Sequence, residues 1–237
     1  MPIALSVVLP AYNEAANIEA TTLAALGVLR GLGGPFEVII VDDGSGDGTA
    51  GIADALARTH AEVRVVHHPS NRGYGAAVRS GFDAATMPWL FFTDADGQFD
   101  LRELPALVAL ARDADIVAGY RLRRRDPWHR RLYALLFGRV LVRALLGVRV
   151  RDLNCAFKLV RRDLAARLAL KSEGALINAE LLGKALRARA RIVEVGVHHL
   201  PRRAGTPTGG KPAVIARAFR ELAALRAEIR TGPRTSG

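Results

Sequence analysis

The stretch Trp89-Leu-Phe-Phe-Thr-Asp-Ala-Asp96 decides the fold, because a short apolar run leads directly into two aspartates separated by one residue. An apolar run of this length predicts a buried strand. Carboxylates that follow such a strand would lie at the carboxyl edge of an open α/β sheet, where ligands bind. Carboxylate oxygens there can hold Mg²⁺ or Mn²⁺, which usually share their coordination shell with phosphate oxygens. An Asp-rich turn that merely ends a strand would give the same letters, so the neighbouring segments must decide.

Apolar segments of strand length alternate with amphipathic segments of helix length on both sides of this stretch. Strands are predicted at residues 5–10, 36–41, 63–66, 89–93, 116–119 and 192–197. Helices are predicted at about residues 14–30, 49–59, 75–85, 101–112 and 179–188. The alternation predicts an α/β fold with a parallel, doubly wound sheet flanked by helices.

Length and composition limit the classes of protein that fit. The chain has 237 residues, half of them hydrophobic, which suits one large domain with a short extension. Cys155 is the single cysteine, so an intrachain disulfide and a Cys-based zinc site are excluded and an intracellular location is expected. The N-terminus enters a strand-like segment at once, which predicts no signal peptide. No uncharged apolar run reaches the length of a membrane span.

The positive charge of the chain is concentrated in its second half. Residues 1–119 carry 7 Lys/Arg and 15 Asp/Glu, whereas residues 120–237 carry 27 Lys/Arg and 8 Asp/Glu. The basic half therefore predicts contact with a polyanion or an anionic membrane surface. An apolar helix at 132–146, with Arg139 and Arg143 on one face, suits the membrane interface or a helix packed on the domain with one solvated face. No RNP-like or helix-turn-helix signature is present, so no nucleic-acid partner is expected.

Four polar motifs follow the first four predicted strands and would meet at one edge of the sheet. They are Pro10-Ala-Tyr-Asn-Glu14, Asp42-Asp-Gly-Ser45, Asn71-Arg-Gly-Tyr-Gly75 and Asp94-Ala-Asp96. No G-x-G-x-x-G follows the first strand, which disfavours a Rossmann dehydrogenase.

Together these motifs resemble the family-2 inverting glycosyltransferases with the GT-A fold, and most closely the dolichol-phosphate mannose synthase-like branch. The resemblance spans about residues 5–215 and includes the segments Arg151-Asp-Leu-Asn-Cys-Ala-Phe-Lys158 and Pro201-Arg-Arg-Ala-Gly205. The branch usually has Gly and Arg where this chain has Ala156 and Lys158, so a cation is kept at 158 but its bidentate geometry is not.

The resemblance also implies a domain organisation and a GT-A type, Rossmann-like, mostly parallel sheet. A glycosyltransferase domain would occupy residues 1–212, with a nucleotide-sugar-binding half at 1–119 and an acceptor-binding half at 120–212. A basic C-terminal extension would follow at 213–237, with an amphipathic helix that begins at about Pro212 and a tail.

In the donor half, the resemblance assigns hydrogen bonds with a guanine or uracil base to Asp42. It places Pro10, Tyr12 and Glu14 around the base and ribose, and Asn71 in a loop that faces the nucleotide. From the residues alone, an Asp here can instead cap the turn before Gly44, a role that is expected of Asp43 more than of Asp42. Tyr12 and Glu14 can equally be a half-buried aromatic residue and a first-turn helix residue.

The acidic motif would serve the sugar nucleotide and the metal. The resemblance places Asp94 and Ala95 against the ribose and diphosphate, and gives the metal mainly to Asp96. Gln98 would be a further metal ligand, or simply a polar loop residue.

In the acceptor half, the resemblance implies cations around the phosphates, because an anionic acceptor phosphate can attack without a general base. These cations are Arg121, Arg130 or Arg131, and Arg202 or Arg203 with Lys211, each of which can equally be a solvated surface charge. A sugar hydroxyl acceptor would need a carboxylate to take its proton, and Asp152 is the best-placed candidate. Asp152 can otherwise orient Arg151 or a backbone turn.

The predicted function is therefore metal-dependent transfer of a hexose from a nucleotide sugar of the GDP-mannose or UDP-glucose type to polyprenyl phosphate. Mg²⁺ or Mn²⁺ would assist departure of the nucleotide diphosphate. The chain would work peripherally at the cytoplasmic face of the cell membrane in synthesis of a cell-envelope glycan, as a homodimer or with a membrane-protein partner. The alternatives are a family-2 enzyme with a sugar or small hydroxyl acceptor, and a non-catalytic nucleotide-binding or membrane-anchoring protein.

Two further polar sites are predicted to be structural. His198 and His199 are consecutive in or beside a strand and would point to opposite faces, which makes a shared metal unfavourable. Cys155 is expected to be a packed residue, because no activating partner is evident.

Overall fold

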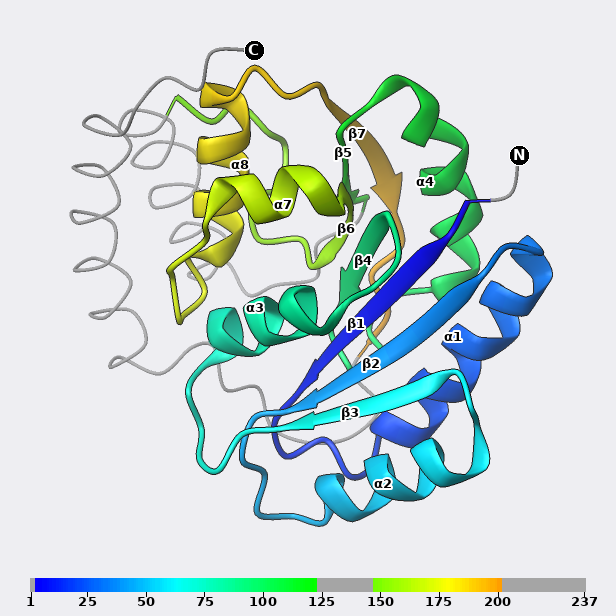
Figure 1. Cartoon of the computed structure of the whole chain (residues 1–237). Helices are drawn as coiled ribbons and strands as arrows, with labels where there is room; N and C mark the ends of the chain where they lie inside the picture. The colour runs from blue at the N-terminus through cyan, green and yellow to red at the C-terminus, as the bar shows by residue number, and fades with distance from the viewer. Residues whose placement is uncertain (1–2, 123–146, 202–237) are drawn as a thin grey trace.

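The computed structural model describes residues 3–122 and 147–201, and within them a seven-stranded mixed sheet forms the centre of the fold (Figure 1). The strand order is β3-β2-β1-β4-β6-β5-β7. The strands are β1 (Leu5–Ala11), β2 (Phe36–Asp42), β3 (Val63–His67), β4 (Trp89–Thr93), β5 (Ile116–Arg121), β6 (Phe157–Arg161) and β7 (Ile192–Val197). All neighbours pair in parallel except β6, which runs antiparallel to both β4 and β5. The predicted mostly parallel sheet is confirmed.

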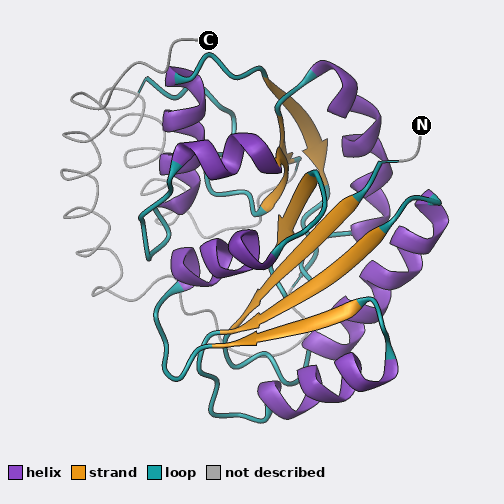
Figure 2. Cartoon of the chain, in the orientation of Figure 1, coloured by secondary structure: helices purple, strands orange, loops and turns teal. Residues whose placement is uncertain are grey.

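Helices cover both faces of the sheet (Figure 2). They are α1 (Ile18–Leu32), α2 (Thr49–Thr59), α3 (Tyr74–Ala84), α4 (Leu104–Leu110), α7 (Arg162–Leu168) and α8 (Ile177–Arg187), with short 3₁₀ turns η1 (Leu101–Glu103) and η2 (Ala111–Asp113) on either side of α4. Helices α1, α2 and α4 lie on one face, and α3, α7 and α8 lie on the other. No helix within these described ranges is both long and apolar enough to cross a membrane.

Alternate residues of the central strands enter two separate cores. Val7 and Leu9 of β1 pack with α1, whereas Val8 between them packs with α3. Because both faces are covered, the strand reads as a continuous apolar run instead of an alternating one. Gly81 lets α3 lie close to the sheet, since a Cβ at this position would be 2.2 Å from a methyl group of Val8.

The structure corrects the sequence-based expectations at three places. Strand β6 and the helix α7 that follows it were not predicted, and β6 is the strand that departs from the parallel arrangement. The helix predicted from residue 14 begins at Ile18, and the helix predicted at 101–112 is divided into η1, α4 and η2. The helices predicted at 132–146 and after Pro212 lie outside the described residues.

Candidate active site

The loops that follow β1, β2, β3 and β4 emerge at one edge of the sheet, because these four strands are parallel. The register places Ala11 beside Asp42, and Asp42 beside His67. Strand β1 lies between β2 and β4. The chain passes from β1 to β2 and β3 over the face covered by α1 and α2, and it returns from β3 to β4 through α3 over the opposite face. A switch of this kind leaves a crevice at the carboxyl ends of the strands, where ligands of α/β proteins bind.

The loops after β1 and β2 are fastened to each other. The backbone N–H of Asn13 donates to Ser45 Oγ at 3.0 Å, and that of Glu14 donates to Thr49 Oγ1 at 2.9 Å. In return, Asn13 Oδ1 accepts from the backbone N–H of Gly46 at 2.9 Å. These bonds hold residues 13 and 14 against the loop after β2, and α1 begins only after Asn17, which has the non-helical φ of −123°.

The two cross-linked loops, residues 12–17 and 43–48, are called the rim below. The residues that were predicted to bind the donor in the first motif lie in β1 and in the first of these loops. Pro10 is buried in β1, whereas the Tyr12 side chain, at 38% exposure, faces solvent. Glu14 Oε2 accepts from the side-chain amide of Asn17 at 2.7 Å, so part of its carboxylate is used to order the turn before α1.

Asp42 is buried at the end of β2 and makes the turn contact that the sequence favoured for Asp43. Its Oδ1 accepts from the backbone N–H of Ser45 at 3.1 Å, and its Oδ2 lies 3.2 Å from His67 Nδ1. Burial opposes the charge of His67, but the carboxylates of Asp42 and Asp54 outweigh it and raise the pKa of His67. The carboxylate predicted to recognise the base is therefore held in a fixed orientation.

Asp43 ties the loop after β3 to the end of β2. Its Oδ1 lies 2.6 Å from His68 Nδ1 and accepts from the backbone N–H of Arg72 at 2.9 Å. Its Oδ2 accepts from the backbone N–H of Gly73 at 2.8 Å. On its other side, His68 Nε2 lies 2.9 Å from Ser80 Oγ of α3. Sequence reasoning missed this network, although the adjacent Asp and His pairs in the sequence were a visible signal.

The loop after β3 is exposed at residues 71–72 and packs against residues 172–174 where it enters α3. Asn71, which was predicted to face the nucleotide, is exposed. The backbone N–H of Gly75 donates to the Glu173 carbonyl oxygen at 2.8 Å, and a Cβ at Gly75 would be 2.5 Å from the Ser172 carbonyl oxygen. The N-terminus of α3 is therefore occupied by the loop before α8.

Asp94 and Asp96 lie together after β4, as predicted. Burial and the negative charge of Asp96 raise the pKa of Asp94 to about 7, while the Tyr74 hydroxyl and the Arg121 guanidinium offset part of this effect. Ala95, between the two, accepts a hydrogen bond from Thr21 Oγ1 through its carbonyl oxygen at 3.0 Å. The pair is therefore a small, partly buried region of excess negative charge, which favours binding of a cation.

A divalent ion fits these donors if substrate completes its coordination. In the part of the chain that is described, no group of three or more His, Cys, Asp or Glu side chains is placed to hold a metal. Mg²⁺ commonly uses only one or two carboxylates together with phosphate oxygens, so the pair Asp94 and Asp96 meets its requirement. Gln98, the further predicted ligand, donates from Nε2 to the Leu200 carbonyl oxygen at 3.1 Å and is thereby anchored to the segment after β7.

Arg121 and Asp152, predicted separately, form a bidentate ion pair. Arg121 Nε donates to Asp152 Oδ2 at 2.6 Å and Nη2 donates to Oδ1 at 2.9 Å. Their side chains are only 13% and 5% exposed. Both oxygens of the Asp152 carboxylate therefore accept charge-assisted hydrogen bonds from one guanidinium group. Asp152 therefore orients the Arg121 side chain, a contact that was not predicted from the sequence.

Lys158, in contrast, is a cation of the interior. Its ammonium group is fully buried and donates to the carbonyl oxygens of Leu153 and Cys155 and to Asn178 Oδ1, the last at 2.8 Å. Burial lowers the pKa of Lys158 to about 8. With three acceptors for its three N–H groups, Lys158 fastens the segment after Asp152 to α8.

The remaining predicted residues are either structural or lie outside the described ranges. His198 Nδ1 lies 2.7 Å from Glu103 Oε1, whereas the His199 ring packs against Phe99 with centroids 5.1 Å apart, so the two imidazoles have different partners. Burial raises the pKa of Cys155 to about 12, which leaves its thiol inert. The residues outside the described ranges are Arg130, Arg131, Arg202, Arg203 and Lys211.

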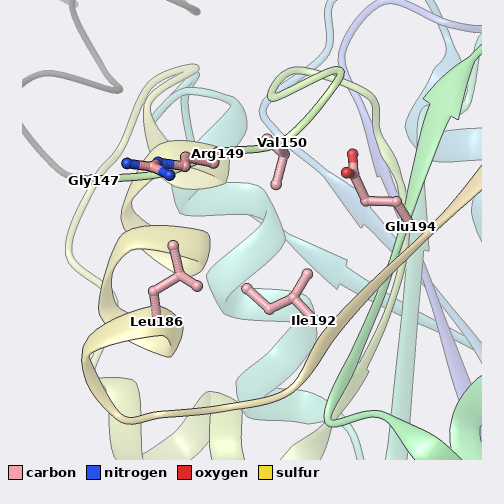
Figure 3. A pocket seen from close by; sticks show the side chains of 6 residues that line it. All are labelled: Gly147, Arg149, Val150, Leu186, Ile192 and Glu194. Carbon is pink, nitrogen blue, oxygen red and sulfur yellow. The ribbon is translucent and has the colours of Figure 1, made fainter.

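A separate pocket of about 230 Å³ lies between α8 and β7 (Figure 3). Its lining residues are Gly147, Arg149, Val150, Leu186, Ile192 and Glu194. None of the predicted site residues lines it, so it is distinct from the strand-end carboxylates.

Comparisons with known proteins agree with this geometry. The family model described as glycosyl transferase family 2 matches residues 6–168. The chain is 34% identical over 207 residues to glycosyltransferase AglD of Haloferax volcanii, an alignment that covers 84% of this chain and 33% of that protein. It is 33% identical over 195 residues to undecaprenyl-phosphate 4-deoxy-4-formamido-L-arabinose transferase of Aeromonas hydrophila, with 81% and 59% covered. An uncharacterized glycosyltransferase of Mycobacterium tuberculosis is 36% identical over 219 residues, with 89% of each chain covered.

Solved structures of glucosyl-3-phosphoglycerate synthase from Mycobacterium tuberculosis share the fold. The complex with UDP superposes with a TM-score of 0.69 and 23% identity over 95% of this chain and 80% of that one. The complex with Mn²⁺ and UDP-glucose gives a TM-score of 0.65 and 24% identity over 96% and 77%. The predicted fold is confirmed.

Proposed function

The chain belongs to glycosyl transferase family 2, and we propose that it transfers a hexose from a nucleotide sugar to polyprenyl phosphate with inversion at the anomeric carbon. One observation carries the proposal: the acidic pair Asp94 and Asp96 lies within electrostatic reach of Arg121, which Asp152 holds by a bidentate ion pair. A site for a cation and a fixed cationic side chain therefore stand at the same sheet edge. Such a combination suits two phosphorylated substrates that must meet there.

The donor half, residues 1–119, supplies the nucleotide site. The loops after β1 and β2 form a cross-linked rim, with the exposed Tyr12 ring at its surface and the Asp42 carboxylate held below. A carboxylate in a fixed orientation can accept N–H groups from the edge of a guanine or uracil ring. Guanine and uracil both meet that requirement, so the donor is a GDP-sugar or a UDP-sugar.

Asp94 and Asp96 would hold Mg²⁺ or Mn²⁺ together with the donor diphosphate. The bound ion supplies Lewis-acid stabilisation of the negative charge that develops on the departing nucleotide. The chain's own contribution is to keep the two carboxylates side by side at the end of β4, where the bond from Thr21 to the Ala95 carbonyl oxygen fixes the backbone between them. Support for the metal also comes from the solved relatives of the same fold, which bind Mn²⁺ or Mg²⁺ with UDP.

The acceptor half, residues 120–212, favours a phosphate over a hydroxyl. Asp152 and Glu180 are the buried carboxylates of residues 147–201, and both are engaged. Asp152 binds Arg121, and Glu180 accepts from two backbone N–H groups and pairs with Lys184 at 2.6 Å. A hydroxyl acceptor needs a base to take its proton, whereas a phosphate is already anionic near neutral pH. Arg121 would then position the acceptor phosphate for attack on the anomeric carbon.

A polyprenyl phosphate acceptor also sets the place of work. The phosphate of such an acceptor lies at the membrane surface. We therefore place the chain peripherally at the cytoplasmic face, where its basic half would bind the anionic surface. It would act there as a homodimer or together with a membrane-protein partner. The relative from Aeromonas hydrophila bears a name that specifies undecaprenyl phosphate, which supports this choice of acceptor.

The test is a transfer assay with radiolabelled GDP-mannose, UDP-glucose and related donors, each offered with polyprenyl phosphate or with free sugar acceptors, in the presence of Mg²⁺ or Mn²⁺. We expect label to move into the organic phase only with polyprenyl phosphate. Label that stays in the aqueous phase as a new glycoside would establish a hydroxyl acceptor instead. A chain that binds nucleotide but transfers no sugar to either acceptor would be a binding protein, and the proposal would be wrong.

A further inference from the structure

The Asp43 carboxylate and the His68 imidazole are buried where the loop after β2 meets the loop after β3, beside the rim. Both side chains are 3% exposed, and their atoms Oδ1 and Nδ1 are 2.6 Å apart. Asp43 also accepts two backbone N–H groups, from Arg72 and Gly73. A buried carboxylate of this kind needs all its donors, because each one replaces water that the group has lost.

The same pair determines where the loop between β3 and α3 lies. The backbone N–H of His68 donates to the Asp42 carbonyl oxygen at 2.9 Å, which extends the β2–β3 pairing into the loop. Gly44 packs so closely against this loop that a Cβ would be 2.5 Å from the Ser70 carbonyl carbon. The exposed tip, Asn71 and Arg72, is therefore fixed from below by Asp43 and from the side by the turn that carries Asp42.

We infer that Asp43 and His68 are positioning residues for nucleotide binding, which act by holding the loop of residues 69–73 in the form that completes the rim. The inference rests on the proposed function, because it takes the rim to be the nucleotide site. Neither side chain would touch a bound nucleotide directly, because both are buried and Asp43 bonds to the backbone of the loop. Their effect is transmitted through the two backbone N–H groups that Asp43 accepts.

The two ring nitrogens of His68 have different partners, so the contact of Nδ1 with Asp43 can be tested separately from the contact of Nε2 with Ser80. In His68→Asn the side-chain amide can donate to Asp43 from a position close to that of Nδ1, but it cannot reach Ser80. In His68→Gln the longer amide reaches toward Ser80 and leaves Asp43 without its partner. Ser80→Ala removes only the outer contact, and Asp43→Asn replaces an acceptor with a donor against the backbone N–H groups.

The experiment measures the Kd of UDP and of GDP by calorimetry in Mg²⁺ for the full chain and these four variants, together with the unfolding midpoint of each. We expect His68→Gln and Asp43→Asn to weaken binding of the preferred nucleotide about tenfold, which is the effect of losing one fixed hydrogen bond at the rim. His68→Asn and Ser80→Ala should stay within about threefold of the unmodified chain. The value of kcat at saturating donor should change little in all four, because the reacting groups are untouched.

Three outcomes separate the possible explanations. Folded His68→Gln that binds nucleotide as tightly as the unmodified chain would overturn the inference. Equal weakening in His68→Asn and His68→Gln, in proportion to their unfolding midpoints, would show a merely structural role and would also overturn it. An unmodified chain that binds neither UDP nor GDP would instead remove the proposed function, and the inference with it.

Discussion

Replacement of Asp152 by Asn removes the negative charge that holds Arg121, and its effects can be worked out from the structure. The contacts of 2.6 and 2.9 Å place the two charge centres about 4 Å apart, which gives an attraction of about 4 kcal/mol at an effective dielectric constant near 20. The cost of removing water from the two charges offsets part of this attraction, because the side chains of Asp152 and Arg121 are only 5% and 13% exposed. A net coupling of about 2 kcal/mol is left, which corresponds to about 30-fold in an equilibrium or rate.

We therefore expect Asp152→Asn to lower the free energy of unfolding by about 2 kcal/mol in urea titrations. Its kcat/KM for the lipid phosphate acceptor should fall about 30-fold, because Arg121 loses its fixed orientation. The decisive control is Arg121→Gln, alone and combined with Asp152→Asn. If Asp152 acts only through Arg121, the second substitution should add little to the first.

The opposite result would refute the reasoning. A general base contributes about 10² to 10⁴ in rate, and a base that does not act through Arg121 would cost the same rate on removal whether or not Arg121 is present. If Asp152→Asn lowers kcat/KM as strongly in the Arg121→Gln background as in the unmodified chain, Asp152 takes a proton directly. The acceptor would then be a hydroxyl compound, and the role assigned to the ion pair would be wrong.

Three further predictions concern stability and the metal. Glu37 is buried, and burial opposes its charge. Hydrogen bonds from Ser6 and Thr86 nevertheless lower the pKa of Glu37 to about 2. The charged form therefore stabilises the fold above about pH 4.5, and this stabilisation is lost as the pH falls toward 2. Glu37→Gln should cost about 1–2 kcal/mol at pH 7, a value reduced for solvent screening, and should flatten the loss of stability between pH 5 and 2; an unchanged acid profile in chemical denaturation would contradict this. Gly81→Ala should destabilise the chain by about 1–3 kcal/mol through overpacking, whereas Gly27→Ala in the open middle of α1 should stabilise it by about 0.5–1 kcal/mol, and equal unfolding midpoints would contradict the packing described. Asp96→Asn should abolish the extra thermal stabilisation that Mg²⁺ gives in the presence of UDP, and a variant that keeps this increment would place the metal elsewhere.

The part of the site that could be predicted from the sequence is the part encoded by strand ends. The motifs at Asp42 and Asp94 each follow an apolar run, and parallel strands bring such ends to one edge regardless of loop details. Their convergence in the structure required no knowledge of side-chain contacts.

Contacts between distant loops could not be predicted in this way. Arg121 and Asp152 were both selected, yet their pairing depends on how two chain segments 31 residues apart return to the same place. The role of Asp43 was missed for the same reason, because its partners lie in a loop whose position is set only by tertiary packing. A single sequence contains no periodic signal for such contacts.

Strand β6 escaped notice because of its own composition. Lys158 interrupts the apolar residues of this five-residue strand, and a charge in the middle of a run argues against burial on both faces. Only the three oxygen acceptors around the ammonium group make its burial acceptable, and two of them belong to the preceding segment. The strand could not be predicted because the oxygen acceptors that allow Lys158 to be buried become visible only in the folded structure.

The reversed direction of β6 has a consequence for the charged groups at the sheet edge. Ala118 of β5 stands beside Lys158 of β6 in an antiparallel ladder, so the chain leaves the sheet after Arg121 and re-enters it at Phe157 from the same side. The end of β5 and the start of β6 are therefore neighbours at the edge where the acidic pair follows β4. Because β6 lies between β4 and β5, it is the shared neighbour of the strand that leads into Asp94 and Asp96 and of the strand that ends in Arg121, so a shift in its register would move the negative and positive groups relative to each other.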